Sequence, residues 1–190
     1  MVGLTACLVL LAGGCGDDDP DKADPPSPSP SSSDGSGSPA EPTTPTETAT
    51  TVAPATGPVL KLRGTRLRLP EGWHVDNDQS NILVVGASED LGMLINLSSF
   101  PSLDRKASLE DLAKATVETG GYAKGSIKKP GEMAGRPAFR VAGKAYGDYT
   151  EEYGLIHKGD IVSVEFVFID APKQGRRELI ESVLATVRLP

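Results

Sequence analysis

The sequence predicts an α+β domain in which an antiparallel β-sheet is flanked by helices. From residue 58 onward, several stretches alternate apolar and polar residues with a period of two, which indicates half-buried strands. Two other stretches place apolar residues at helical spacing, around 108–121 and after residue 172. The resulting order of strands, helix, strands and helix, with short links, favours an antiparallel sheet with helices packed on it.

The first strands are predicted from alternating leucines and bases. The pattern that predicts one or two strands is Leu60, Leu62, Leu67 and Leu69 against Lys61, Arg63, Arg66 and Arg68. A turn at 70–73 brings in the only tryptophan, Trp73. Further strands are expected at 82–85 and 94–97, separated by a connection at 86–92 that is rich in turn residues.

The first helix has a clear start and stop. Ser108 is the expected N-cap, with Asp111 three residues later as a short form of the capping box. Gly120 and Gly121 supply the C-terminal stop. The apolar positions between them are Leu109, Leu112, Ala113, Thr116 and Val117.

Four strands and a closing helix complete the domain. The strands are expected at 122–129, 137–146, 149–157 and 161–169, with the last two joined by a bend at Lys158-Gly159. The glycine of Ala134-Gly-Arg-Pro137 is expected in a turn before a strand. The closing helix is predicted to begin at Pro172, and its apolar stripe is Leu179, Ile180, Val183, Leu184 and Val187.

The acidity of the chain belongs to one segment. Residues 16–57 contain eight acidic residues and one lysine, whereas 58–190 contain 18 acidic and 18 basic residues. A nucleic-acid-binding domain is expected to be basic or to carry a basic stripe. The neutral balance of 58–190 therefore argues against a nucleic-acid partner.

The N-terminal segment 1–14 is predicted to be a signal peptide. Residues 4–12 are apolar but too few to cross a bilayer as a helix, which takes about 20 residues. They fit the h-region of a secretory signal, and the small residues 12–14 fit a cleavage site. Because no lysine or arginine precedes them, we expect the true start to lie upstream of Met1.

Cys15 has three competing interpretations: half of a disulfide, a core thiol or an attachment point. A disulfide between Cys7 and Cys15 would not cross-link a hydrophobic core, because both cysteines precede the predicted domain. The stretch Leu11-Ala-Gly-Gly-Cys15 resembles the lipobox of bacterial lipoproteins, although Ala12 stands where that family usually has leucine. The resemblance implies cleavage before Cys15 and a diacylglycerol thioether on its sulfur. An ordinary signal with an incidental cysteine is the alternative.

Residues 15–57 are predicted to be a lipid-anchored, disordered linker. They hold nine of the 16 prolines, many serines and threonines, and few large apolar side chains. A coil of this length spans roughly 35 Å. An unmodified linker is preferred over O-glycosylation. Together with Cys15, the linker predicts a protein held at the outer face of the bacterial cytoplasmic membrane.

The sequence predicts no catalytic, metal or cofactor site. The acidic stretch 17–24 fails as an EF-hand, because Lys22 and Pro28 stand where the loop needs Gly and Glu. His74 and His157 have no partners at metal-ligand spacing. Glu151 and Glu152 are adjacent on a strand and must point to opposite faces, so we expect one of them to pair with a base across a hairpin.

The domain 58–190 also resembles a known fold. The residues that carry the resemblance are Leu69-Pro-Glu-Gly-Trp73, the 108–121 helix, Ala134-Gly-Arg-Pro-Ala-Phe-Arg140, Val162-Ser-Val-Glu-Phe-Val-Phe168 and the Leu179–Leu184 helix. Together they are similar to the PsbP-like fold and to LpqN-type lipoproteins of actinobacteria. That resemblance implies a mostly non-catalytic protein that docks on other proteins.

The predicted function is a monomeric extracytoplasmic binding module with a protein partner. The alternative is a carrier that holds a small apolar ligand in a cavity of about 300 Å³ or more between sheet and helices. No ligand-binding residue is assigned. The aromatic side chains are expected to pack in the core and at sheet edges, with a ligand groove as the alternative: Trp73, Tyr122, Tyr146, Tyr149 and Tyr153.

Overall fold

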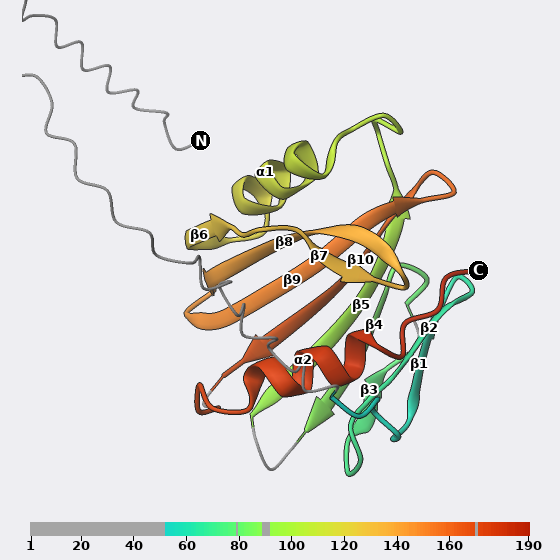
Figure 1. The fold of residues 1–190 in the computed structure, drawn as a ribbon, viewed down its shortest axis with the longest axis vertical. Helices are drawn as coiled ribbons and strands as arrows, with labels where there is room; N and C mark the ends of the chain where they lie inside the picture. The colour runs from blue at the N-terminus through green and yellow to red at the C-terminus, as the bar shows by residue number, and fades with distance from the viewer. Residues whose placement is uncertain (1–51, 79, 89–91, 170) are drawn as a thin grey trace, which may run out of the picture. The chain divides into compact units, whose positions relative to one another are not determined.

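The computed structural model describes residues 52–78, 80–88, 92–169 and 171–190 (Figure 1). The chain divides into two units, Met1–Glu47 and Thr48–Pro190, and only the second contains described residues. Cys15, the signal peptide and nearly all of the linker lie outside the described residues. The predictions made for them therefore remain predictions.

The described part contains ten strands and two helices. In chain order they are β1 (Val59–Leu62), β2 (Thr65–Arg68), β3 (His74–Asn77), β4 (Leu83–Ser88), β5 (Met93–Pro101), α1 (Leu109–Thr119), β6 (Tyr122–Ile127), β7 (Gly131–Met133), β8 (Arg136–Ala145), β9 (Asp148–His157), β10 (Asp160–Phe168) and α2 (Arg176–Leu184). The main sheet is antiparallel in the order β3-β4-β5-β10-β9-β8-β6, and β7 pairs with β8. β1 and β2 form a separate hairpin.

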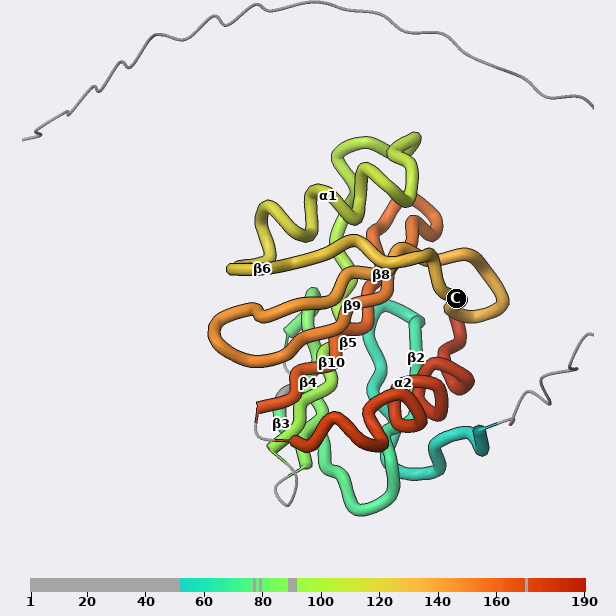
Figure 2. Tube along the Cα trace, turned by 60° about the vertical axis from the view of Figure 1, so that its left-hand side comes forward, coloured from blue at the N-terminus to red at the C-terminus, as the bar shows by residue number. Residues whose placement is uncertain are grey.

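Both faces of the main sheet are covered, each by different elements. One face, here the inner face, carries Ile95, Val164 and Phe166, which share a hydrophobic cluster with the β1–β2 hairpin and with α2. The opposite or outer face carries Phe139 and Val141, which pack against α1. Figure 1 and Figure 2 show α1 beside β6 and α2 near the β1–β2 hairpin. The predicted α+β sheet flanked by helices is confirmed.

The first helix begins and ends where the sequence predicts. Ser108 is the N-cap, and its hydroxyl accepts a hydrogen bond from the Asp111 amide at 3.1 Å. The Asp111 carboxylate accepts the Ser108 amide hydrogen bond in return, also at 3.1 Å, which completes the capping box. Gly120 is the C-cap.

Two hairpin bends also follow the predictions. Lys158 and Gly159 have φ values of 52° and 89°, and Ala134 and Gly135 have 54° and 72°. Positive φ at both central residues is the geometry of a type I′ turn, whose twist matches that of the flanking strands. These bends bring β9 against β10 and β7 against β8.

Three predictions about the elements are wrong in detail. Pro172 does not begin the closing helix: α2 begins at Arg176 after the N-cap Gly175, which has a φ of 81°. The helix ends at Leu184, so Val187 of the predicted stripe is buried but lies beyond the helix. β4 continues through Ser88, so part of the expected 86–92 connection is strand. β3 and β7 were not predicted, because His74–Asn77 and Gly131–Met133 show too little alternation of apolar and polar residues to indicate a strand.

The globular unit includes residues that the prediction assigned to the linker. Ala55 is buried in the inner cluster, and its amide donates to the Ser182 carbonyl at 3.0 Å. Gly57 donates its amide to the Leu69 carbonyl at 2.8 Å. All buried residues of the two clusters lie between Ala55 and Val187, so a fragment of residues 48–190 contains them all.

Candidate functional site

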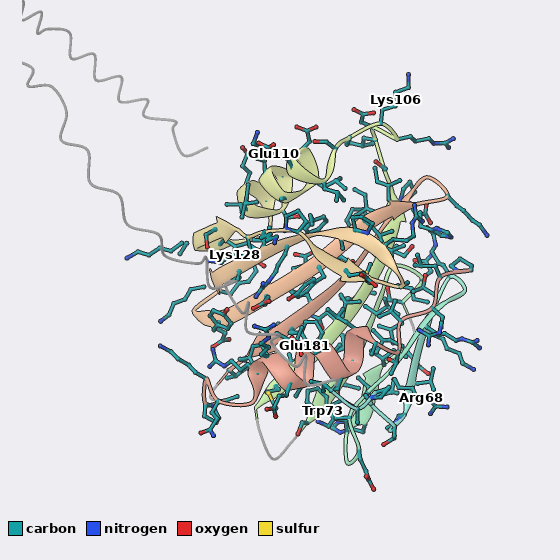
Figure 3. The ribbon with its side chains drawn as sticks, viewed as in Figure 1. Arg68, Trp73, Lys106, Glu110, Lys128 and Glu181 are labelled. Carbon is teal, nitrogen blue, oxygen red and sulfur yellow. The ribbon has the colours of Figure 1, made fainter. Side chains whose placement is uncertain are left out.

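A groove lies on the inner face between α2 and strands β8 and β9. It has a volume of about 420 Å³, and a second hollow of about 440 Å³ shares five of its lining residues. We call the first hollow the α2 groove. Its lining consists of Arg140, Tyr149, Glu151, Tyr153, Lys173, Arg176, Arg177, Ile180 and Glu181. Figure 3 labels Glu181 on α2.

The floor of the α2 groove is a buried carboxylate with three donors. Glu151 is 4% exposed, and its carboxylate accepts hydrogen bonds from Arg140 Nε at 2.7 Å, from the Tyr153 hydroxyl at 2.6 Å and from the Tyr149 hydroxyl at 3.1 Å. Every second residue of a strand faces the same way, so Tyr149, Glu151 and Tyr153 all point to the inner face. Arg140 reaches them because β8 pairs Arg140 with Tyr153.

The prediction that one of the two glutamates pairs with a base across a hairpin is thereby confirmed. Burial is the main cause that raises the pKa of the Tyr153 phenol above its usual value, and the hydrogen bond to Glu151 raises it further. Burial is also the main cause that raises the pKa of the Tyr149 phenol, and the charge of Glu151 raises it further. Both phenols therefore stay protonated at neutral pH and act as donors.

Arg176 forms one wall of the α2 groove. Its guanidinium carbon lies 4.6 Å from the ring centre of Tyr149 and 4.8 Å from that of Phe168, in cation–π geometry. Its guanidinium also donates to the Pro172 carbonyl at 3.0 Å and to the Ala171 carbonyl. These contacts fix Arg176 at the start of α2, with its charge beside the groove.

The α2 groove carries an excess of positive charge. Four bases line it, Arg140, Lys173, Arg176 and Arg177, against two acids, Glu151 and Glu181. Two of the arginines stand in the first turn of α2, where the helix dipole disfavours cations. The same helix end attracts anions. The groove therefore suits a carboxylate or another anionic group.

The described residues assemble no metal centre. Across 52–78, 80–88, 92–169 and 171–190, no group of three or more His, Cys, Asp or Glu side chains is placed to hold a metal ion. His74 is exposed on β3. His157 ends β9, where Nδ1 lies 2.8 Å from Arg136 Nη1 and Nε2 lies 3.0 Å from the Pro190 carbonyl oxygen.

The five candidate aromatic residues separate into four environments. Tyr149 and Tyr153 pack with the inner cluster, as expected for core aromatics, and they also line the α2 groove, the alternative expected from the sequence. Trp73 is buried in the inner cluster, and Tyr122 packs against the cluster under α1. Tyr146 is 86% exposed. The alternation of Tyr149, Glu151 and Tyr153 would have indicated a polar cluster, but the position of Arg176 could not be predicted from it.

A second polar cluster lies on the outer face of the sheet. Glu152 is half-buried there, and Glu165 faces it across the β9–β10 pair. Burial raises the pKa of Glu152 from 4.5 to about 7, a hydrogen bond with Ser163 opposes the shift, and the charge of Glu165 adds to it. Glu165 itself accepts a hydrogen bond from Asn96 Nδ2 at 2.8 Å.

The raised pKa of Glu152 predicts that the contribution of this residue to stability falls as pH rises. The folded chain holds the Glu152 proton more tightly than the unfolded chain, so the free energy of unfolding decreases between pH 4.5 and about pH 7. We expect Glu152→Gln to raise the free energy of unfolding at pH 8 by about 1 to 3 kcal/mol. Urea denaturation at pH 4.5 and pH 8 measures this. An equal effect at both pH values would contradict the prediction, and Glu118→Gln, at an exposed position of α1, is the control.

Comparison with known proteins gave matches only among solved structures. No family model matches the chain, and no curated protein matches it. Three similar solved structures come from bacteria. LpqN of Mycobacterium tuberculosis, "involved in cell envelope biogenesis", has a TM-score of 0.46 and 12% identity over 70% of this chain and 90% of that one.

The second structure is the cyanobacterial PsbP of Synechocystis, with a TM-score of 0.45 and 10% identity over 67% of this chain and 87% of that one. The third is a protein of Bacteroides thetaiotaomicron, with a TM-score of 0.44 and 15% identity over 67% of this chain. This chain spans 45% of that protein's length. At these scores the likeness carries no statement about function.

Among the described residues, no helix is long and apolar enough to cross a membrane.

Proposed function

We propose that this protein is a lipid-anchored extracytoplasmic binding module whose α2 groove holds an acidic segment of a protein partner. The apolar run before Cys15 and the acidic, proline-rich stretch behind it support the anchor. Stable anchoring takes two acyl chains, which a diacylglycerol on Cys15 would supply. The anchor would hold the domain at the outer face of the cytoplasmic membrane.

The observation that carries the binding role is the charge of the α2 groove. Its acids are already paired, Glu151 with Arg140 and Glu181 with Arg177 at 2.6 Å, whereas Lys173 and Arg176 have no carboxylate within salt-bridge distance among the described residues. An incoming carboxylate would meet these two cations and the N-terminal end of α2.

A carrier of an apolar ligand fits this groove less well. The volume of about 420 Å³ exceeds what that alternative requires. The lining does not suit it, because Ile180 is the one aliphatic side chain among the nine residues. An apolar ligand would leave charged groups desolvated and unpaired, which costs free energy.

The binding role is tested with fragment 48–190 and two peptides, hexaglutamate and hexaglutamine. We expect hexaglutamate to shift the amide resonances of residues 149–153 and hexaglutamine to leave them unchanged. Lys173→Glu/Arg177→Glu should weaken hexaglutamate binding by about tenfold or more, because the first change replaces attraction by repulsion and the second leaves Glu181 beside another acid in place of its partner cation. Both side chains are exposed, so the fold should survive.

Lys128→Glu/Lys129→Glu is the matched control, since it changes the net charge equally at exposed positions that do not line the groove. Equal weakening by the control would contradict the assigned site. The anchor is tested separately in cells that express the full chain. Cys15→Ser should move the protein from the membrane fraction to the soluble fraction, and retention in the membrane would contradict the anchor.

A further inference from the structure

A second surface of the domain is basic, and its charge is not balanced. The β1–β2 hairpin, the segment 54–56 and the end of the chain after α2 enclose an open depression of about 950 Å³. Four bases line it, Lys61, Arg66, Arg68 and Arg188, and all four are exposed. No acidic residue is among its lining residues in the described part. We call this surface the basic face; Arg68 is labelled in Figure 3.

The backbone register places these like charges next to one another. Lys61 pairs with Arg66 across the hairpin, and Arg66 forms an isolated bridge with Arg188. The Arg66 amide donates to the Arg188 carbonyl at 3.0 Å, and the Arg188 amide donates to the Arg66 carbonyl at 2.8 Å. Directly opposed residues point to the same side, and like charges in that position destabilise a sheet. The fold thus keeps an unfavourable row of cations.

The four bases of the basic face are not paired with acids in the described part of the protein. None of the ion pairs among the described residues involves Lys61, Arg66, Arg68 or Arg188. The guanidinium of Arg68 donates to the Gly57 carbonyl at 3.2 Å, and that of Arg188 donates to the Val187 carbonyl at 2.7 Å. Those bonds orient the side chains and leave their charge without a carboxylate partner, unlike Arg140 and Arg177 of the α2 groove.

The position of the basic face in the chain favours one kind of partner. Pro54, Ala55 and Thr56 line the depression, so the basic face lies where the chain enters the globular unit from its N-terminal side. Under the proposed function that side leads back to a lipid on Cys15. An anionic bilayer surface is therefore the anion that the tether would keep nearest.

We infer that the basic face docks the domain on the anionic lipid headgroups of the membrane to which it is tethered. A juxtamembrane base gains about 1 kcal/mol near an anionic leaflet, and the gain decays within a Debye length. Contact through exposed cations around an open depression suits a fluid headgroup layer, which needs no shape complementarity. The inference goes beyond the proposed function and concerns a different surface from the α2 groove.

Sedimentation of fragment 48–190 with vesicles tests this inference without the anchor. One set of vesicles contains phosphatidylglycerol and phosphatidylcholine in a 3:7 ratio, and the other contains phosphatidylcholine alone. We expect binding to the anionic vesicles only, with strong weakening between 50 mM and 500 mM salt. Lys61→Gln/Arg66→Gln should lower the partition coefficient by about 30-fold at low salt, at about 1 kcal/mol for each base.

The matched control is Lys128→Gln/Lys129→Gln, which removes the same two charges elsewhere; Lys128 lies near β6, away from Arg68 (Figure 3). An equal loss in both variants would overturn the inference, because net charge alone would then explain the binding. Displacement by millimolar inorganic phosphate, or tighter binding to a single-stranded oligonucleotide at the same salt, would also overturn it. Because the fragment has no Cys15, this result is independent of the anchor test.

Discussion

Replacing Phe166 by alanine is expected to lower the free energy of unfolding by about 3 to 5 kcal/mol. Phe166 lies on β10 at the centre of the main sheet and is fully buried, with a relative exposure of 0%. Its ring forms a T-shaped pair with that of Tyr153, at a centroid distance of 6.3 Å and an interplanar angle of 87°. The truncation would leave a cavity between the sheet and the elements that cover its inner face. Chemical denaturation of fragment 48–190 measures the loss.

Phe100 provides the control for this prediction. It lies on the neighbouring strand β5 and is 43% exposed, so Phe100→Ala removes an aromatic ring of the same size from a half-solvated position. We expect a loss of about 1 kcal/mol or less there. Similar losses at the two positions would contradict the packing described for the inner face.

Replacing Arg140 by methionine is expected to cost about 2 to 3 kcal/mol, because it leaves the buried Glu151 carboxylate with neutral donors only. The side chain of Glu151 is 5% exposed and that of Arg140 is 38% exposed. Water therefore reaches one partner, which keeps the expected loss below that of a fully buried pair. The free energy of unfolding at pH 7 measures it.

A double-mutant cycle separates the ion pair from simple packing loss. Arg140→Met/Glu151→Gln should cost clearly less than the two single changes added together, because no unpaired charge is then buried. Arg177→Met is the surface control: its side chain is 90% exposed, so we expect a loss of about 0.5 kcal/mol or less. Additive single changes would show that Glu151 gains nothing from Arg140.

The same variant bears on the binding role. Arg140 holds Glu151 together with the hydroxyls of Tyr149 and Tyr153, and these three side chains form the floor of the α2 groove. Loss of stability and loss of hexaglutamate binding should therefore coincide in Arg140→Met. In Lys173→Glu/Arg177→Glu, by contrast, binding should fall while stability is kept.

Local patterns in the sequence determined most of the fold. The capped helix α1, the alternating β1–β2 hairpin and the bend at Lys158-Gly159 all depend on residues a few positions apart. Such short-range signals can be recognised in the sequence because a cap, a type I′ turn and a half-buried strand each require particular residue types at fixed spacing. The start of α2 was misplaced because proline at the first helical turn is permitted but does not itself begin a helix.

The α2 groove and the basic face could not be predicted from such local patterns. The sequence shows 18 acidic and 18 basic residues in 58–190, and that balance argued against a basic stripe. The tertiary structure distributes these charges unevenly. It brings Arg188 beside Arg66, more than a hundred residues away in the chain, and leaves the acids elsewhere. Net charge is a sum over the chain, whereas the charge of a surface depends on which residues the fold brings next to one another.

The sequence by itself determined the class of the domain, the bounds of α1 and the bend at Lys158-Gly159, and it predicted an anchor at Cys15. Tertiary structure alone decided that Arg176 packs on Tyr149 and that Arg140 reaches Glu151 and Tyr153. It also decided that four bases, three from the hairpin and Arg188 from the end of the chain, line one depression. The physical reason is range: propensity and periodicity act over a few residues, whereas a groove forms only when segments distant in the chain pack together.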